Sequence, residues 1–202
     1  MIGVTSAATP KGLRRRARLI AAAGELLIEG GYDAVRHRAV AERADLPLAS
    51  TTYYFESLED LLVEAATHTC RDDEECIRAR AEALNKRRRG AEATAEALAE
   101  VFVGPDTTRR ALTNRIETVV LSTRCARLEP LLDERRKMLA GLHGDVLDKC
   151  GRVADPGRIA QLMAVEDGAV AGALADATDD VAEATRLALT DLVDVLAPVA
   201  PE

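Results

Sequence analysis

The sequence has no tryptophan and only two phenylalanines and three tyrosines among 202 residues, which disfavours a pocket that stacks planar cationic ligands. No uncharged run approaches the roughly 18 residues that cross a bilayer, so a membrane span is excluded. The pattern of a signal peptide is also missing, because the basic run Arg14–Arg16 precedes the apolar Leu19 and Glu25 soon interrupts that stretch. We therefore expect a cytoplasmic protein without membrane contact.

Clusters that bind metals or carry out catalysis are also missing from the sequence. There is no CxxC pair, no nucleophile with a recognisable base, and no glycine-rich loop that could hold a phosphate. We therefore expect no metal, no cofactor and no enzymatic activity. Reduced thiols are the simplest interpretation of the cysteines, with a redox-sensing thiol as the alternative. The cysteines are Cys70, Cys76, Cys125 and Cys150. The histidines His37, His68 and His143 are not placed to complete a zinc site with them.

Charge is unevenly distributed along the chain. Residues 1–55 hold 8 Lys and Arg against 5 Asp and Glu, a balance of +3, and residues 56–202 hold 19 against 29, a balance of −10. The basic side chains concentrate between Lys11 and Arg18, where no acid occurs. A basic segment on an acidic body is typical of a duplex-binding module, although such runs are often simply solvated.

Apolar residues recur at helical spacing throughout the chain, whereas the alternation typical of strands is nearly absent. The pattern predicts an all-α protein. A first helix of about 15 residues is expected from Leu13 to just before Gly30-Gly31, because glycine readily adopts the conformation that stops a helix. Its apolar stripe would comprise Leu13, Ala17, Ile20, Gly24, Leu27 and Ile28.

Two short helices are predicted next, over 36–44 and 48–54. The break between them contains Asp45, which tolerates a left-handed turn, and Pro47, which can begin a helix but not continue one. Ser57 has an acid three positions later, as a helix N-cap often does, so a long helix is expected from Leu58. Helices are predicted at about 58–87, 91–103, 106–127, 131–150, 156–175 and 180–197.

A longer helix followed by two short helices with a tight turn describes a three-helix helix-turn-helix, whose last helix enters the major groove of DNA. The motifs resemble the TetR family of bacterial transcriptional regulators. Residues 31–34 are similar to the family's G-[FY]-x-A, 40–46 to I-A-x-x-A-G-V, and 50–62 to T-L-Y-x-[HY]-F-x-S-K-E-x-L-L. The resemblance implies a helix-turn-helix DNA-binding domain at 10–57 and a helical ligand-sensing and dimerisation domain at 58–202.

The resemblance further implies which side chains contact DNA. Arg38 falls where the family places a base-reading or phosphate-binding side chain, and an arginine can pair with O6 and N7 of guanine. His37 either contacts DNA or covers the start of its helix, and Thr51 faces inward. The candidate contacts are Arg14, Arg15, Arg36, His37, Arg38, Leu48, Ala49, Ser50, Thr52, Tyr53 and Tyr54, with Arg16 and Arg18 as further basic residues of the arm.

Four positions depart from the family pattern. Asp45 replaces the turn glycine, Pro47 a capping serine, Thr52 the first tyrosine of a pair, and Leu58 a lysine that commonly binds a phosphate. Leu58 in place of the lysine puts one contact with the DNA backbone in doubt. His37, Arg38 and the basic arm could compensate for it.

A seam of small residues in the predicted helix 156–175 would permit close approach of another helix. The resemblance implies that the last two helices pair with their copies in a second chain as a four-helix bundle, although packing within one chain would use the same seam. Apolar area around the seam would come from Ile159, Met163, Val170, Leu174 and Val195. The candidate dimer residues are Ala160, Ala164, Gly168, Gly172, Leu187 and Leu192.

Polar residues interrupt the apolar stretch around residues 116–121. A buried polar group needs a partner, and a small-molecule effector could be one, with salt bridges and exposed faces as the alternative. The candidate ligand-binding residues are Arg115, Thr118, Ser122 and Cys125.

Three functions are weighed against these features. The first is a ligand-responsive repressor that binds a palindromic DNA operator as a homodimer and is released by a small-molecule effector. The second is a helical dimer that binds small molecules and has lost operator binding, which the departures at Thr52 and Leu58 and the acidic body would suit. The third, an all-helical enzyme, has no supporting motif.

Overall fold

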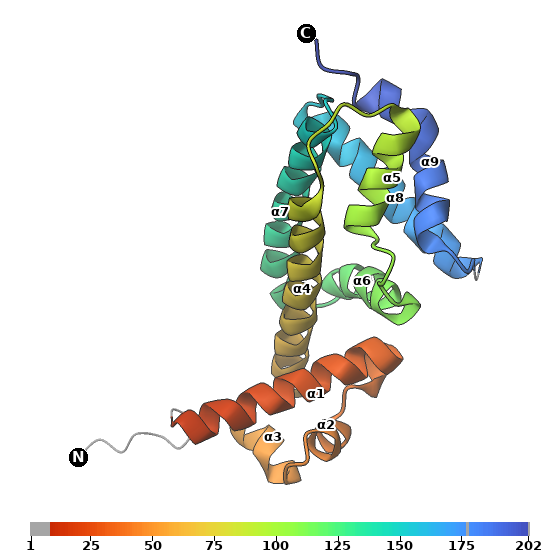
Figure 1. Cartoon of the computed structure of the whole chain (residues 1–202). Helices are drawn as coiled ribbons and strands as arrows, with labels where there is room; N and C mark the ends of the chain where they lie inside the picture. The colour runs from red at the N-terminus through yellow and green to blue at the C-terminus, as the bar shows by residue number, and fades with distance from the viewer. Residues whose placement is uncertain (1–8, 177, 202) are drawn as a thin grey trace.

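The computed structural model describes residues 9–176 and 178–201, and all regular structure within these ranges is helical. Helices α1 (Pro10–Ala34), α2 (His37–Arg43) and α3 (Leu48–Tyr54) form a small unit at one end, from which α4 (Leu58–Ala83) runs into the body (Figure 1). The body holds α5 (Ala91–Phe102), α6 (Arg109–Ser122), the 3-10 helix η2 (Ala126–Leu128), α7 (Glu129–Lys149), α8 (Pro156–Ala175) and α9 (Val181–Leu196). The prediction of an all-α protein is confirmed.

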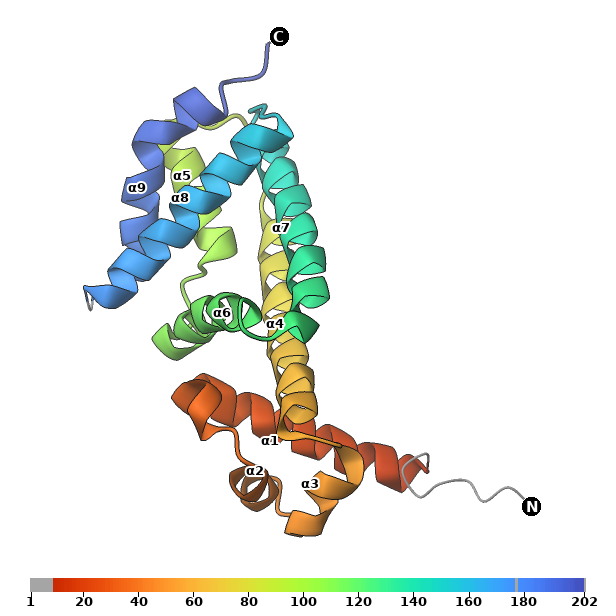
Figure 2. The ribbon, with the colours of Figure 1, turned by 180° about the vertical axis from the view of Figure 1, so that it is seen from behind.

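The body consists of two groups of helices that pack directly against each other, α4 with α7 in one group and α5, α8 and α9 in the other. α4 and α7 run side by side, while α8 and α9 run in opposite directions next to α5 (Figure 2). α6 lies across the lower end of the body, between these helices and α1 (Figures 1 and 2). Within the described ranges, no helix combines the length and the apolar character that crossing a bilayer requires.

α1 is longer than predicted but stops where predicted. It begins at Pro10, because the Thr9 hydroxyl accepts a hydrogen bond from the Gly12 amide (3.1 Å) and caps the first turn. Its regular part ends at Gly30 and Gly31, and Gly31 adopts a left-handed conformation with φ of 65° that favours glycine.

The buried face of α1 differs from the predicted stripe. Leu19, Ala23 and Leu27 are buried, whereas Leu13 is 57% exposed and Ala17 is also exposed. The stripe is wrong at its start, because Leu13 and Ala17 lie on a side of α1 that no described helix covers.

Two other helix boundaries were predicted incorrectly. The expected helix 106–127 is shorter, since α6 ends at Ser122 and Cys125 is extended before η2. The expected helix 58–87 stops at Ala83, because the backbone amides of Arg87 and Arg89 donate to the Lys149 and Cys150 carbonyls (2.8 and 3.0 Å) instead of continuing the helix.

The hydrophobic core has two main parts, and α4 contributes to both. The lower part joins α1, α2, α4 and η2 through side chains such as Leu19, Val40 and Leu61. The upper part joins α4, α5, α7, α8 and α9 around Ile77 and Phe102. α4 therefore connects the α1–α3 unit to the body by packing as well as by covalent continuity.

Candidate nucleic-acid interface and ligand-binding cavities

The turn between α2 and α3 depends on Asp45. This residue has a φ of 50°, the left-handed conformation predicted for it in place of glycine. The turn is closed by the Leu46 amide, which donates to the Ala41 carbonyl (3.0 Å). α3 then starts at Leu48 after Pro47, which offers no side-chain cap.

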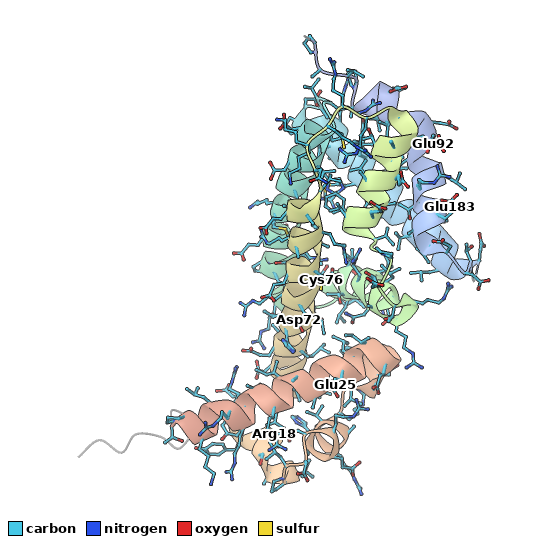
Figure 3. The ribbon with its side chains drawn as sticks, viewed as in Figure 1. Arg18, Glu25, Asp72, Cys76, Glu92 and Glu183 are labelled. Carbon is cyan, nitrogen blue, oxygen red and sulfur yellow. The ribbon has the colours of Figure 1, made fainter. Side chains whose placement is uncertain are left out.

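Two arginines of the predicted basic arm instead make contacts within the chain. The Arg18 guanidinium donates to the Ala44 carbonyl at the end of α2, and Figure 3 shows it on the side of α1 that faces the two short helices. Arg16 pairs with Glu64 (2.6 Å) and lies over the ring of Phe55. Both guanidiniums thus hold α1 to its neighbours, and their contact with DNA stays a prediction.

The surface of α3 is open to solvent along one side. Leu48 and Tyr53 are 51% and 54% exposed, while Tyr54 is half-buried and meets the Tyr53 ring edge-to-face at 4.9 Å. Thr51 is fully buried and its hydroxyl donates to the Leu48 carbonyl (2.8 Å), so the prediction that it faces inward is confirmed. Ala49 and Thr52 are also exposed and Ser50 is half-buried.

The start of α2 presents basic side chains next to α3. Arg38 is exposed and its Nε donates to Glu42 (3.0 Å), and Arg36 donates to the Val35 carbonyl and to Asp33. His37 is half-buried, and its Nδ1 is buried without a hydrogen-bond partner among the described residues. Arg14 and Arg15 are exposed near the start of α1.

Sequence reasoning missed the contact that fixes α2 against α1. Arg43 makes ion pairs with Glu25 (3.1 Å) and Glu29 (2.7 Å), and the hydrogen bond from Arg43 lowers the pKa of Glu29. These partners are 18 and 14 positions apart, so no local spacing could have indicated the pair. Leu58, at the usual lysine position, packs partly buried against the lower core.

The central cavity lies between α4, α6 and α7 and has a volume of about 330 Å³. Of the predicted ligand-binding residues, Arg115 and Thr118 line it. Asn114 lines it as well, and its Oδ1 is buried without a hydrogen-bond partner among the described residues while its Nδ2 donates weakly to Thr69 (3.4 Å). Asn114 was not predicted, although a polar residue beside Arg115 and Thr118 could have indicated it.

An ion-pair network forms one wall of the central cavity. Asp73 pairs with both Arg115 (2.6 Å) and Arg135, and Arg135 also pairs with Glu74 (3.3 Å). Burial raises the pKa of Asp73, but the two guanidiniums outweigh burial and hold that pKa below its usual value. The alternative weighed for Arg115, a salt bridge, therefore occurs at the edge of the cavity.

The junction cavity, of about 640 Å³, separates the end of α1 from α4 and α6. Thr118 and Cys125 line it, and Thr118 lines the central cavity too. Ser122 lines neither the central nor the junction cavity, and its hydroxyl donates to the Val119 carbonyl (2.7 Å) in the last turn of α6. The structure therefore divides the four predicted ligand-binding residues instead of bringing them together.

The buried cysteines lack the features of reactive thiols. Burial raises the pKa of Cys70, Cys125 and Cys150, and at Cys125 a hydrogen bond to Glu59 adds to the effect. Cys76 is exposed on α4 (Figure 3). No group of three potential metal ligands occurs in the part of the chain that the structure describes.

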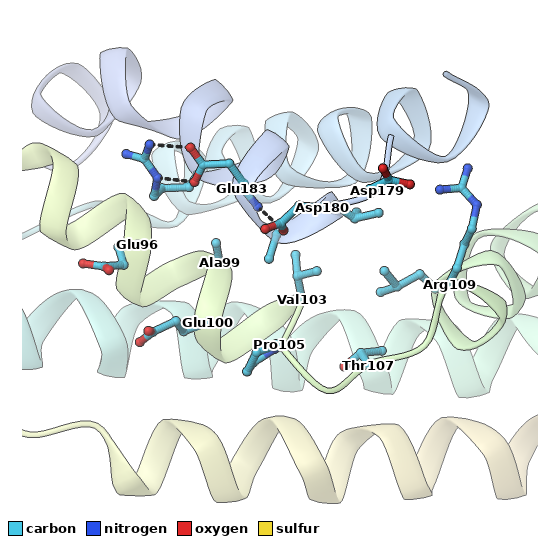
Figure 4. A pocket seen from close by; sticks show the side chains of 15 residues that line it. Glu96, Ala99, Glu100, Val103, Pro105, Thr107, Arg109, Asp179, Asp180 and Glu183 are labelled. Carbon is cyan, nitrogen blue, oxygen red and sulfur yellow. Dashed lines mark hydrogen bonds and ion pairs between the residues drawn. The ribbon is translucent and has the colours of Figure 1, made fainter. Parts of the chain in front are cut away.

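A third cavity, of about 530 Å³, lies between α5 and α9 and is rich in carboxylates. Figure 4 shows Glu96, Glu100, Asp179 and Asp180 around it. Arg186 and Arg109 also line this cavity. Arg186 forms an ion pair with Glu183 (2.6 Å), and Arg109 donates to the Thr178 carbonyl (3.0 Å). None of the predicted ligand-binding residues lines this cavity.

The small-residue seam of α8 is exposed in the single chain. Ala160, Ala164, Gly168 and Gly172 all lie at the surface, and a Cβ added at either glycine would meet no atom within 4 Å. On α9, Leu187 and Val195 are 57% and 64% exposed, and Leu192 is half-buried. Met163 and Val170 were expected to surround the seam but are buried within the chain, because they lie on the opposite face of α8.

Two family models match the chain. A model described as bacterial regulatory proteins, tetR family, matches residues 19–65, and one described as tetracyclin repressor-like, C-terminal domain, matches residues 89–195. The HTH-type transcriptional repressor KstR of Rhodococcus jostii (strain RHA1) is 49% identical over 51 residues, which are 25% of this chain and 24% of that protein. The chain thus covers about a quarter of the length of the curated relatives it matches.

Solved structures are similar over most of the chain. The multidrug binding protein EbrR complexed with imidazole is 29% identical, with a TM-score of 0.68 and coverage of 88% of this chain and 94% of that one. EbrR has also been solved with proflavin and with ethidium. A TetR family member from Streptomyces coelicolor A3 is 30% identical, with a TM-score of 0.64 and coverage of 88% and 97%.

Proposed function

The chain belongs to the TetR family of bacterial regulatory proteins and is a DNA-binding transcriptional regulator, not an enzyme; from this premise we propose that it is a repressor released by a small-molecule effector. It would bind a palindromic operator as a homodimer, with residues 10–57 binding DNA and residues 58–202 sensing the ligand and dimerising. The observation that carries the proposal is the exposed side of α3, where Leu48 and Tyr53 are more than half exposed beside basic Arg38.

The exposed side chains suit distinct parts of a DNA duplex. Arg38 would read a base or bind a phosphate, and Leu48 and Ala49 would meet thymine methyl groups in the major groove. Tyr53 would donate its hydroxyl to a phosphate. The basic start of α1 would supply phosphate or minor-groove contacts through Arg14 and Arg15. The proposed surface also includes Arg36, His37, Ser50, Thr52 and Tyr54.

The exposed seam of α8 supports dimerisation. Small side chains at Ala160, Ala164, Gly168 and Gly172 would let α8 of a second copy approach closely. The exposed Leu187 on α9 would lose its contact with water in such a bundle, which supplies a hydrophobic driving force. A twofold axis here would present two α3 helices to one face of a duplex, about one helical turn apart.

The central cavity supports effector binding. Its volume of about 330 Å³ falls in the range of small-molecule sites, and the buried Asn114 Oδ1 is an unpaired acceptor in its wall. The similarity to EbrR, a multidrug binding protein, is consistent with a ligand in the body.

α6 provides a physical path from the cavity to the DNA-binding helices. It carries Arg115 and Thr118 in the cavity wall, and its Glu117 carboxylate packs against Gly31 at the end of α1. Beyond α6, Arg127 pairs with Asp60 at the start of α4. An effector that binds better when α6 is displaced would shift α1 and reduce the DNA-competent population.

The experiment that tests the proposal is selection of bound duplexes from a random pool by the purified full chain. We expect an inverted repeat whose half-sites lie one helical turn apart, and an affinity that falls by roughly 10³ between 50 and 200 mM salt. If no sequence is enriched and binding hardly changes with salt, the alternative of a ligand-binding dimer without operator binding is correct instead. Leu58, packed against the core in place of a phosphate-binding lysine, is the observation in favour of that alternative.

A further inference from the structure

A cleft at the upper end of the body concentrates positive charge. It lies between the end of α4, the connection 84–90 and the end of α5, and has a volume of about 420 Å³. Three arginines, Arg80, Arg87 and Arg89, line it beside a single carboxylate, that of Glu100. The rest of this arginine cleft is mainly apolar and consists of Ala83, Leu84, Val101 and Pro105, with Asn85.

Arg80 brings a charge into the cleft that forms no ion pair with a described residue, although the nearby carboxylates of Asp73 and Asp106 act to raise its pKa. Its Nε donates to the Val101 carbonyl (2.8 Å), and its Nη2 is buried without a partner among the described residues. The guanidinium packs on the backbone of Gly104, where an added Cβ would lie 2.5 Å from the Arg80 Cζ. Burial lowers the pKa of Arg80, and the nearby Arg115 lowers it further, so a negative charge here would be stabilising.

The other two arginines also lack acidic partners. Arg89 donates to the carbonyls of Asn85 and Arg87 (3.0 and 3.2 Å) and contacts the Cys150 sulfur, but forms no ion pair with any described residue. The Arg87 side chain is exposed and has no hydrogen bond or ion pair within the described ranges. The Arg87 guanidinium is therefore available to a ligand, whereas that of Arg89 already donates to these acceptors and to the Lys149 carbonyl (3.5 Å) and contributes positive charge.

The connection that carries these arginines is fixed to the body. The backbone amides of Arg87 and Arg89 donate to the end of α7, as described above, and Arg152 donates to the Arg89 carbonyl (3.4 Å). Arg152 is itself buried and pairs with Asp194 (2.7 Å). A site built on a fixed segment loses less entropy when it binds a ligand than one built on a mobile loop.

This grouping is unusual for an acidic protein. The chain has a net charge of −7, and several other arginines of the body are paired, as Arg115 is with Asp73, Arg127 with Asp60 and Arg186 with Glu183. Three arginines and one glutamate line the arginine cleft, so its lining residues have a net charge of +2.

We propose that the arginine cleft is a second ligand site, which binds a small organic anion. The carboxylate of such a ligand would pair with Arg87, with Arg80 and Arg89 adding positive charge, while its apolar chain would lie on Leu84 and Val101. The site differs from the proposed effector cavity, although Arg80 lines both. The connection 84–90 crosses in front of the body in Figure 1, whereas α8 lies in front in Figure 2, so a dimer built on α8 leaves the cleft open.

The proposal is tested by isothermal titration calorimetry of the full chain with hexanoate, hexanamide and hexylamine at equal ionic strength. We expect hexanoate to bind and the neutral and cationic probes to bind at least tenfold more weakly, because they lack the negative charge. Inorganic phosphate should compete but bind more weakly than hexanoate, since it has no apolar part. Equal binding of hexanamide and hexanoate would overturn the proposal.

Two variants test whether hexanoate binds in the arginine cleft. Arg87→Gln should weaken hexanoate binding about tenfold without affecting the fold, because its side chain makes no contact that the fold needs. Arg78→Gln, on the exposed side of α4, is the matched control and should leave the affinity unchanged. If both variants weaken binding equally, the attraction is general and the cleft is not a site. Operator binding is measured on the same proteins, so that loss of the proposed repressor function is recognised separately.

Discussion

Among single residues, Asp45 sets how α3 is oriented in the proposed DNA-binding surface. Its left-handed φ of 50° reverses the chain within three residues, which places α3 beside α2 with Thr51 inside and Tyr53 outside. Arg18 holds the same turn by donating to the Ala44 carbonyl. Arg18 therefore positions the proposed surface, whereas Arg14, Arg15 and Arg38 are the arginines proposed to contact DNA.

Two single substitutions distinguish general contact with the DNA backbone from recognition of particular bases. Tyr53→Phe removes one exposed hydroxyl, so we expect operator and random duplex to lose affinity alike, by about 1 kcal/mol. Arg38→Ala should cost about 1–3 kcal/mol at the operator and relax its base preference. Fluorescence anisotropy with both duplexes measures these changes.

The control for this pair is Tyr32→Phe, which alters a tyrosine of similar exposure near the junction cavity and should leave both affinities unchanged. Parental affinity in both Tyr53→Phe and Arg38→Ala would mean that α2 and α3 do not form the contact surface.

Among the helices, α6 has the most connections relevant to function. It lines the central and junction cavities through Thr118, it reaches Gly31 of α1 through Glu117, and it joins the ion-pair network through Arg115. Asp73 of α4 links α6 to α7 by pairing with a guanidinium from each. The position of α6 is therefore held by a charged contact at the wall of the proposed effector cavity.

Asp73→Asn should lower the free energy of unfolding by about 3 kcal/mol, because Arg115 and Arg135 would keep their charges without the shared carboxylate. The neighbouring Asp72→Asn changes an exposed carboxylate paired only with His68 and should cost less than about 1 kcal/mol. Urea unfolding at pH 7 measures both.

The Asp73→Asn variant also tests how the free energy of unfolding depends on pH. The pKa of Asp73 is lower in the folded state than its usual value of about 3.9, so the stability it contributes is present above that value and is lost as the pH falls through the folded pKa. The difference between the parent and Asp73→Asn should therefore shrink below about pH 4. A constant difference would show that Asp73 stabilises the fold by packing and not by charge.

For the whole molecule, the proposed function requires two copies, and the single chain leaves a face suited to pairing. The small residues of the α8 seam are exposed, and so are Leu187 and Val195 on α9, which packs against α8. Burial of such a surface is the expected driving force for association.

Gly168→Arg should convert a dimer to a monomer, because the large side chain would block the approach of a second α8 while finding open space in the single chain. Sedimentation velocity should show the mass fall from twice 21.7 kDa to 21.7 kDa. Gly141→Arg on α7 is the matched control, since Gly141 is also an exposed helical glycine with no atom near an added Cβ. Dimers of both variants would place the interface elsewhere.

The sequence alone determined the features that depend on neighbouring residues. The turn at Asp45, the stop at Gly31 and the cap at Ser57 each follow from local backbone preferences, and the inward direction of Thr51 follows from the family resemblance. The family also followed from the sequence, because its motifs occupy a continuous segment.

Only the tertiary structure decided which groups meet across the chain. Arg43 with Glu25, Asp73 with Arg135, and the division of the predicted ligand-binding residues between two cavities all involve residues that are distant in sequence. Whether an arginine binds DNA, as proposed for Arg14, or supports the fold, as Arg18 does, depends on whether an acceptor lies within its reach, and helical periodicity carries no information about that distance.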